Sequence, residues 1–315
     1  MFYRPMFRFV PDGTKIRFMN GRFAGLITSA VLSTASIFLF FYPGLNLGLD
    51  FRGGVVLQVQ TQQAADFPAL RVALADAGLK DASLQAFGQG GNGVLISLES
   101  RDNAAATQTS IQEAESALAK AAPGSKILST QAIGASVSQQ LFAQGLEALG
   151  LSFVMILAYI WFRFEWQFAV GAVATLVLDT TKTIGFMVLT RIPFDLVTIA
   201  AILTIIGYST NDKVVVYDRV RENLRKYKSM PLRELIDLSI NETLNRTLGT
   251  SGTVFLAALP LALFGGHALS GFAWIMLFGI VVGTSSSIFI AAPILLFLGE
   301  HRLRRSAAPV KVTAK

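Results

Sequence analysis

The sequence predicts an α-helical polytopic membrane protein, with six transmembrane helices and one small α+β external domain between spans 1 and 2. The mean hydropathy is +0.53 and only 15% of the residues are charged, whereas an ordinary soluble domain has about 25%. Apolar runs of about 20 residues, enough to cross the hydrocarbon core of a bilayer, recur along the chain. The segment 43–140 instead carries acidic and basic residues and has no run of that length.

The composition also excludes several classes of site. The chain has no cysteine and two histidines, so we expect no disulfide framework and no zinc site. Its net charge is +7, but the basic residues lie beside apolar runs, which indicates membrane topology rather than nucleic-acid binding. We find no nucleophile-and-base pair, metal-ligand cluster or phosphate loop, so we expect neither an enzyme nor a cofactor.

The first span follows a basic N-terminal tail. Residues 1–23 carry five lysines and arginines, and residues 24–42 follow without a charge. A cleaved signal peptide would have an apolar region of about 7 to 15 residues followed by a small-residue cleavage site. Here Tyr42-Pro43-Gly44 follows, which favours a retained transmembrane helix.

Segment 43–140 shows the patterns of a small α+β domain. Period-two alternation predicts strands that include Val55–Val59 and Val94–Leu98, and we expect two more at Ser83–Phe87 and Lys126–Ile133. Apolar residues on one helical face predict two helices, with Phe67, Leu70 and Leu74 in the first and Ile111, Ala114, Leu118 and Ala121 in the second. The resulting order of strand, helix, two strands, helix and strand is that of a ferredoxin-like domain.

Five further spans are predicted after this domain, at 141–162, 168–189, 196–217, 248–264 and 271–298. The charged segment 218–247 is expected to be a loop that contains a surface helix from Pro231 to about Ile240. Four small residues repeat every fourth position along the last span and predict close packing against another helix; they are Gly279, Gly283, Ser287 and Ala291.

The basic residues predict the orientation in the membrane. The N-terminal tail has five lysines and arginines, the segment from Lys213 to Arg246 has eight and the tail 299–315 has five. The short loops near Arg191 and His267 share one. The positive-inside rule therefore places both termini in the cytoplasm and the 43–140 domain on the opposite side of the membrane.

One carboxylate stands inside an apolar run. Asp212 is the 17th of 22 residues in the fourth predicted span, and an aspartate at the centre of such a helix costs roughly 2.5 to 3.5 kcal/mol. A charged residue that is retained in a membrane span despite this free-energy cost usually has a partner and a functional role. We expect Tyr208 and Ser209, at i−4 and i−3, to donate hydrogen bonds to it. Asn211 and Lys213 flank it in the sequence.

Arg246 precedes the fifth span and is expected at a depth comparable with that of Asp212. Two interpretations remain open. A carboxylate that faces a guanidinium in a poorly solvated cleft can exchange protons, because it is either charged and paired or protonated and released. The alternative is a static ion pair that locks two helices, with Lys213 reaching the headgroups. Asp179 and Lys182 share a face of the third span and could neutralise each other.

A family resemblance runs through most of the chain. The motifs that carry it are Gly48-Leu-Asp-Phe-Arg-Gly-Gly54, Phe162-Arg-Phe-Glu-Trp166, the block from Thr198 to Asn223, Leu244-Asn-Arg-Thr247 with Thr250-Ser-Gly-Thr253, and Phe264-Gly-Gly266. With this arrangement of spans, the chain resembles the SecD/SecF family of the bacterial protein-export machinery, and within it the smaller of the paired subunits, SecF. The family is related to the resistance-nodulation-division transporters.

The resemblance implies a multi-pass subunit of the bacterial inner membrane that helps to couple the proton-motive force to translocation and release of unfolded secretory polypeptides. The implied partners are a SecD-like subunit in a heterodimer, the SecYEG channel and YajC. By position, Asp212 resembles the family's proton-conducting carboxylate and Arg246 its functional arginine. Asp179 matches an acidic position in the third span.

The family's D-F-x-G-G motif is matched by Asp50, Arg52, Gly53 and Gly54. For this motif we favour a structural turn between the first span and the first strand. The glycines would allow unusual backbone angles there, and the two charges would form a pair at the rim.

The chain also departs from the family. Leu178 stands where relatives often have histidine, and Lys182 and Lys213 stand where we expect uncharged residues. Two other functions are considered. One is a half-unit of a proton-driven exporter of small molecules or lipids, completed by a partner chain, and the other is a passive scaffold in a membrane complex.

Overall fold

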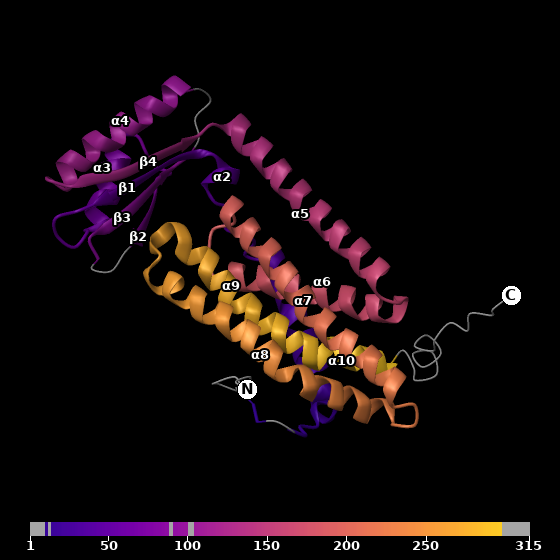
Figure 1. The fold of residues 1–315 in the computed structure, drawn as a ribbon. Coiled ribbons are helices and arrows are strands. Elements are labelled where there is room, and N and C mark those ends of the chain that lie inside the picture. The colour runs from indigo at the N-terminus through magenta and orange to yellow at the C-terminus, as the bar shows by residue number, and fades with distance from the viewer. Residues whose placement is uncertain (1–9, 12–13, 88–90, 100–103, 298–315) are drawn as a thin grey trace, which may run out of the picture.

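The helical body of the protein carries a small sheet domain at one end (Figure 1). The computed structural model describes residues 10–11, 14–87, 91–99 and 104–297. The helices of the body are η1 (Phe18–Gly21), α1 (Arg22–Phe41), α5 (Ala135–Arg163), α6 (Trp166–Thr190), α7 (Leu196–Lys226), α8 (Leu232–Phe264), α9 (Gly266–Ser286), the π-helical η2 (Ser287–Ala291) and α10 (Ala292–Phe297). Within the described residues, six helical stretches are long and apolar enough to cross a membrane, as the sequence predicts.

The sheet domain has the predicted ferredoxin-like arrangement. Its elements are α2 (Leu49–Arg52), β1 (Gly54–Gln60), α3 (Phe67–Asp76), β2 (Ser83–Phe87), β3 (Gly93–Leu98), α4 (Ala104–Ala121) and β4 (Lys126–Ile133). The strands pair antiparallel in the order β2-β3-β1-β4. The alternation of β1 buries Val55, Leu57 and Val59 against α3 and α4, which contribute Leu70 and Leu118.

The charged segment between the fourth and fifth spans is mostly helical. The helix expected from Pro231 is confirmed as the start of α8, but the predicted extent of the loop, 218–247, is wrong. Helix α7 continues to Lys226, and α8 already begins at Leu232, so residues 227–231 connect the two. The charges remain within helices because they pair across them. Arg219 Nε lies 2.7 Å from Glu242 Oε2, and the buried Asn223 Nδ2 donates to Ser239 Oγ at 3.0 Å.

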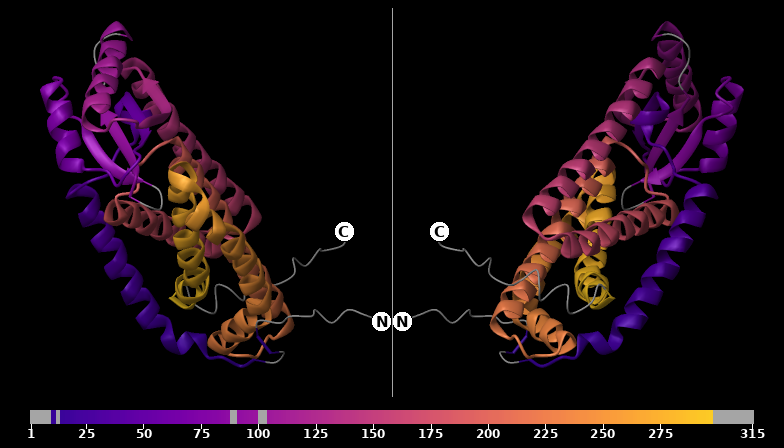
Figure 2. Two further views of the ribbon diagram at one scale, coloured as in Figure 1. Left: turned by 90° about the vertical axis from the view of Figure 1, so that its left-hand side faces the viewer. Right: turned by 90° about the vertical axis from the view of Figure 1, so that its right-hand side faces the viewer.

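The start of α1 lies at the end of the body opposite the sheet domain (Figure 2). There, the backbone N–H of Met19 donates to Asp237 Oδ1 of α8 at 2.9 Å. The backbone of Ile16 exchanges two hydrogen bonds with the side-chain amide of Asn241, at 3.0 and 2.9 Å. The chain segment before the first span therefore packs beside the connection between α7 and α8.

The small-residue strip of the last span packs closely, as predicted. A Cβ atom on Gly279 would overlap the side chain of Ile205, and one on Gly283 would lie 3.1 Å from Ser209 Cβ. Helix α9 therefore approaches α7 through its glycines. The π-helical turn η2 follows, immediately before Pro293, which lacks the N–H that would bond to the carbonyl of residue 289.

Candidate functional site

Polar side chains from four helices meet inside the helical body, between two apolar clusters. One cluster includes Phe168 and Tyr217, and the other includes Ile205 and Ile280. The polar residues between them, which we call the polar layer, are Asp179 and Lys182 of α6, Ser209, Asp212 and Lys213 of α7, Ser251 of α8, and Thr284 and Ser286 of α9.

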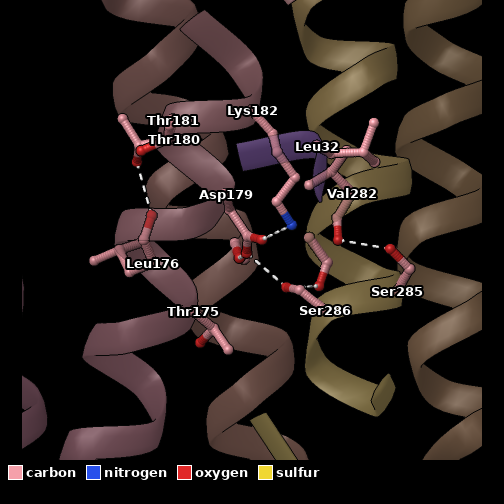
Figure 3. A network of polar contacts seen from close by, with 12 residues as sticks. Leu32, Thr175, Leu176, Asp179, Thr180, Thr181, Lys182, Val282, Ser285 and Ser286 are labelled. Carbon is pink, nitrogen blue, oxygen red and sulfur yellow. Dashed lines mark hydrogen bonds and ion pairs between the residues drawn. The ribbon is translucent and has the colours of Figure 1, made fainter. Parts of the chain in front are cut away.

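Asp179 is the most heavily bonded group of the polar layer, with only 2% of its side chain exposed. Its Oδ1 lies 3.3 Å from Lys182 Nζ, so the predicted pair is confirmed (Figure 3). Its Oδ2 accepts from three further groups, namely Lys213 Nζ at 2.9 Å, Ser209 Oγ at 2.8 Å and Ser286 Oγ at 2.6 Å. Three helices therefore converge on one carboxylate, which has two ammonium groups as partners.

Lys213 points into the body, so the expectation that it reaches the headgroups is wrong. Its side chain is 1% exposed, and its ammonium also donates to the carbonyl of Ser209 at 3.3 Å and contacts the Ser209 hydroxyl. The cause lies in helix geometry, because residues four apart share a face. Ser209 and Lys213 therefore both face Asp179 on the neighbouring helix.

Asp212 is held differently. Its side chain is 3% exposed, and its Oδ2 accepts from Ser251 Oγ at 3.2 Å and from Thr284 Oγ1 at 3.3 Å. The two hydroxyls also lie 2.8 Å from each other. The predicted donors from its own helix are wrong, since Ser209 bonds to Asp179 and, among the described residues, Tyr208 makes no hydrogen bond to Asp212.

Arg246 lies on α8, five residues before Ser251, and is exposed in this chain. Within the described part of the chain, no ion pair of 4.0 Å or less joins it to Asp212. It is nevertheless close enough to act electrostatically on that carboxylate. Asn211 is likewise exposed, on the side of α7 away from the polar layer. The static ion pair considered from the sequence is therefore not formed.

The D-F-x-G-G segment docks onto the start of α7. Gly53 and Gly54 have φ angles of 71° and 120°, as the turn interpretation predicts, because such angles favour glycine. The expected pair of Asp50 with Arg52 is wrong. Asp50 Oδ2 instead accepts from the backbone N–H of Leu196 at 3.0 Å, and Arg52 is exposed.

Further contacts fix this docked segment. The backbone N–H of Gly48 donates to the carbonyl of Phe194 at 2.8 Å, and that of Phe194 donates to the carbonyl of Asn46 at 2.7 Å. The ring of Phe51 packs on Phe142 and Phe194, with centroids 5.3 Å apart in both cases. The sheet domain is therefore connected to both α5 and the N-terminus of α7.

Sequence reasoning did not identify Ser251, Thr284 and Ser286 as ligands of the two carboxylates. Their signal in the sequence is weak, because a serine or threonine in a membrane span commonly bonds to a carbonyl of its own helix. Ser286 does this as well, donating to the carbonyl of Gly283 at 3.0 Å.

Comparisons with protein families agree with the motifs. The model of the protein export membrane protein SecD/SecF, C-terminal, matches residues 113–301, and the SecD/SecF GG motif model matches residues 38–65. The protein translocase subunit SecF of Cereibacter sphaeroides is 40% identical over 278 residues, covering 86% of each chain. That of Rickettsia akari is 41% identical over 276 residues, covering 87% of this chain and 89% of the relative.

Two solved structures are similar as well. The crystal structure of SecDF, a translocon-associated membrane protein from Thermus thermophilus, matches 91% of this chain with a TM-score of 0.82 and 29% identity. SecDF in a super-membrane-facing form matches 96% with a TM-score of 0.62 and 30% identity. This chain spans 39% and 41% of those two chains. From its motifs, its fold and its relatives, the chain belongs to the SecD/SecF family of protein-export membrane proteins.

Proposed function

We propose that this accessory subunit of the Sec protein-export machinery works with a SecD-like partner to couple the proton-motive force to translocation and release of secreted polypeptides, and that Asp212 carries the proton. The environment of Asp212 supports this assignment. The carboxylate is buried and bonded to two hydroxyls. Among the described residues, no lysine or arginine nitrogen lies within 4.0 Å of it.

The two hydroxyls suit a group that changes its protonation state. A hydroxyl can donate to a carboxylate and can accept from a carboxylic acid. Ser251 and Thr284 can therefore serve both forms of Asp212 after rotation of their O–H bonds. Asp179 is bonded to two ammonium groups, which are donors only, so its contacts favour the ionised form. We assign proton transfer to Asp212 and a structural role to Asp179.

The residues on the exposed side of α7 and α8 indicate that a partner with its own transmembrane helices packs there. Polar and small residues spaced by about one turn form a strip there, which we call the α7–α8 strip; they are Thr204, Gly207 and Asn211 of α7 and Arg246, Gly249 and Thr253 of α8. Polar residues within membrane spans rarely face lipid, and small residues let helices approach closely. We assign this strip to the SecD-like partner, with Arg246 supplying a positive charge at the boundary.

We propose that the protein resides in the bacterial inner membrane with both of its termini in the cytoplasm. The basic segment 14–22, which leads into α1, and the charged α7–α8 connection lie at one end of the body, and the sheet domain lies at the other (Figure 2). The positive-inside rule assigns the basic end to the cytoplasm. The sheet domain is then periplasmic, where it can contact unfolded secretory polypeptides. The SecYEG channel and YajC remain the expected neighbours in the membrane.

The test of this function is Asp212→Asn in inverted membrane vesicles that contain the chain with its SecD-like partner. We expect export to lose its dependence on the proton-motive force while the two subunits still co-purify. Asp218→Asn on the same helix is the matched control, because this carboxylate pairs with Arg163 at 2.7 Å on the exposed side. Unchanged proton-driven export in Asp212→Asn would exclude the proton role and favour the passive scaffold.

A different partner would favour the exporter of small molecules or lipids. The co-purification in the same experiment separates these functions, because an exporter half-unit would be recovered with a second transporter half rather than with a SecD-like chain. We expect the SecD-like chain.

A further inference from the structure

Four carboxylate or ammonium side chains are almost fully buried in the part of the chain that the structure describes. They are Asp179, Lys182, Asp212 and Lys213, exposed by 2%, 5%, 3% and 1%. All four belong to the polar layer and come from two adjacent helices, α6 and α7. Two are acidic and two are basic, so in their ordinary ionised forms their charges sum to zero.

The charges do not balance pair by pair. Asp179 has both lysines within 3.3 Å, whereas Asp212 has only hydroxyls as partners. The group of Asp179 with its two lysines therefore carries one excess positive charge, and Asp212 carries one negative charge. An isolated charge in a poorly solvated interior is strongly destabilising, so neither of the two opposite charges is stable in the layer without the other.

We propose that Lys182 and Lys213 are positioning residues for Asp212, because the excess positive charge they leave on Asp179 holds Asp212 in its ionised form at rest. This inference rests on the proton role proposed for Asp212. Uptake of a proton there removes the only compensating charge and leaves the polar layer with a net charge of +1. This unbalanced charge favours entry of water into the layer or a rearrangement of its side chains. Because Asp212 and Lys213 are both on α7, proton uptake is thereby linked to a change in the packing of α7.

Among the described residues of the neighbouring elements, the charge that acts on Asp212 from outside the layer is Arg246 on α8, which is exposed. Helix α9 faces the layer with the uncharged Thr284 and Ser286. Helix α1, which packs against α6 at Gly185, contributes the uncharged Ser36. In the described residues of these elements, no other buried ionisable group can compensate Asp212.

The test is a double-mutant cycle between Asp212→Asn and Lys182→Met, measured as thermal unfolding of the full chain in complex with its partner. The two residues share no ion pair, because Lys182 bonds to Asp179. Each single change leaves a net charge, whereas the double change restores neutrality. We expect the double variant to melt at a higher temperature than either single variant. Mutations at sites without contact usually have additive effects. If the decrease in melting temperature of the double variant equalled the sum of the two single decreases, the proposal would be overturned.

One control variant separates charge balance from packing. Thr175→Val removes a buried hydroxyl of α6 without changing charge, and its effect should add to that of Asp212→Asn. Because this cycle measures melting and not transport, it remains decisive even if Asp212→Asn were to retain proton-driven export and the proposed function were to fail.

A transport measurement tests the positioning role directly. In vesicles with the partner, Lys182→Met should move the pH dependence of proton-driven export to higher pH, because loss of one positive charge from the polar layer favours the protonated form of its carboxylate Asp212. Lys182→Arg should retain the original profile. A lower rate of export with an unshifted profile in Lys182→Met would show a purely structural role and would overturn the proposal.

Discussion

At the scale of single residues, Ser251 and Thr284 decide how the carboxylate of Asp212 is held. Replacing both, as Ser251→Ala with Thr284→Val, leaves the buried carboxylate without its two hydrogen bonds, and each buried group left unsatisfied costs about 1–3 kcal/mol. We expect the double variant to have a lower melting temperature and to lose proton-driven export in vesicles. Thr181→Val is the control, since that hydroxyl lies outside the polar layer and the α7–α8 strip and bonds to the carbonyl of Val177 on its own helix at 2.8 Å.

Equal export in the double variant and the control would show that the hydroxyls do not take part. The single variants carry a further expectation. Because each hydroxyl lies within 3.3 Å of the same oxygen, Oδ2, either one alone can still serve Asp212. Each single variant should therefore lose less than half as much melting temperature and proton-driven export as the double variant loses.

The ionisable residues of the site could be predicted from the sequence, but their partners could not. Asp179, Lys182 and Asp212 stand out because charge is rare in apolar runs. Which residues they contact depends on the rotation of four helices about their axes, and the sequence does not reveal that rotation. Ser209 shows this, because it is three residues from Asp212 yet donates to Asp179 on α6.

At the scale of elements, the N-terminus of α7 has two carboxylates. Asp195 forms a capping box with Thr198, at 2.8 Å in both directions, and Asp50 of the D-F-x-G-G segment accepts from Leu196. Both satisfy N–H groups that a helix leaves unpaired at its start. The segment that begins the sheet domain therefore completes the start of the helix that carries Asp212.

Asp50→Ala should loosen this connection. Loss of a capping carboxylate costs about 0.5–2 kcal/mol, so we expect faster amide hydrogen exchange at Leu196 and Gly48 and weaker proton-driven export. Asp66→Ala is the matched control, because Asp66 caps α3 inside the sheet domain through Ala69 at 3.1 Å. If Asp50→Ala left exchange at Leu196 unchanged, the connection would be held by the backbone bonds of Gly48 and Phe194 alone.

The lengths of α7 and α8 could not be predicted, for a physical reason. Hydropathy marks where a helix enters water, so the charged residues after Tyr217 predict the end of the span. Those residues continue the helix because they pair with charged residues of the neighbouring helix. Arg219 of α7, for example, pairs with Glu242 of α8. The strands of the sheet domain can be predicted with nearly the observed bounds because their alternation is set locally by one buried face.

At the scale of the whole molecule, the polar layer divides the apolar interior into two parts. The cluster that includes Ile205 also contains Phe51 and Phe194, so it extends from the polar layer to the docked D-F-x-G-G segment. A change in packing of α7 at the layer can therefore reach the sheet domain through contiguous contacts. Six spans and an inserted domain could be predicted from hydropathy, whereas this continuity depends on tertiary packing.

The α7–α8 strip yields a prediction for the assembled complex. The chain has no native cysteine, so single cysteines at Asn211 and Thr253, both exposed on this strip, can be labelled selectively with a maleimide. In detergent, we expect both to react in the isolated subunit and to be protected when the SecD-like partner is bound. Leu151→Cys on α5, where the native side chain is 65% exposed, is the control and should react equally in both states. Equal reactivity of all three would place the partner on another face and leave the exposed polar groups of α7 and α8 without a protein cover.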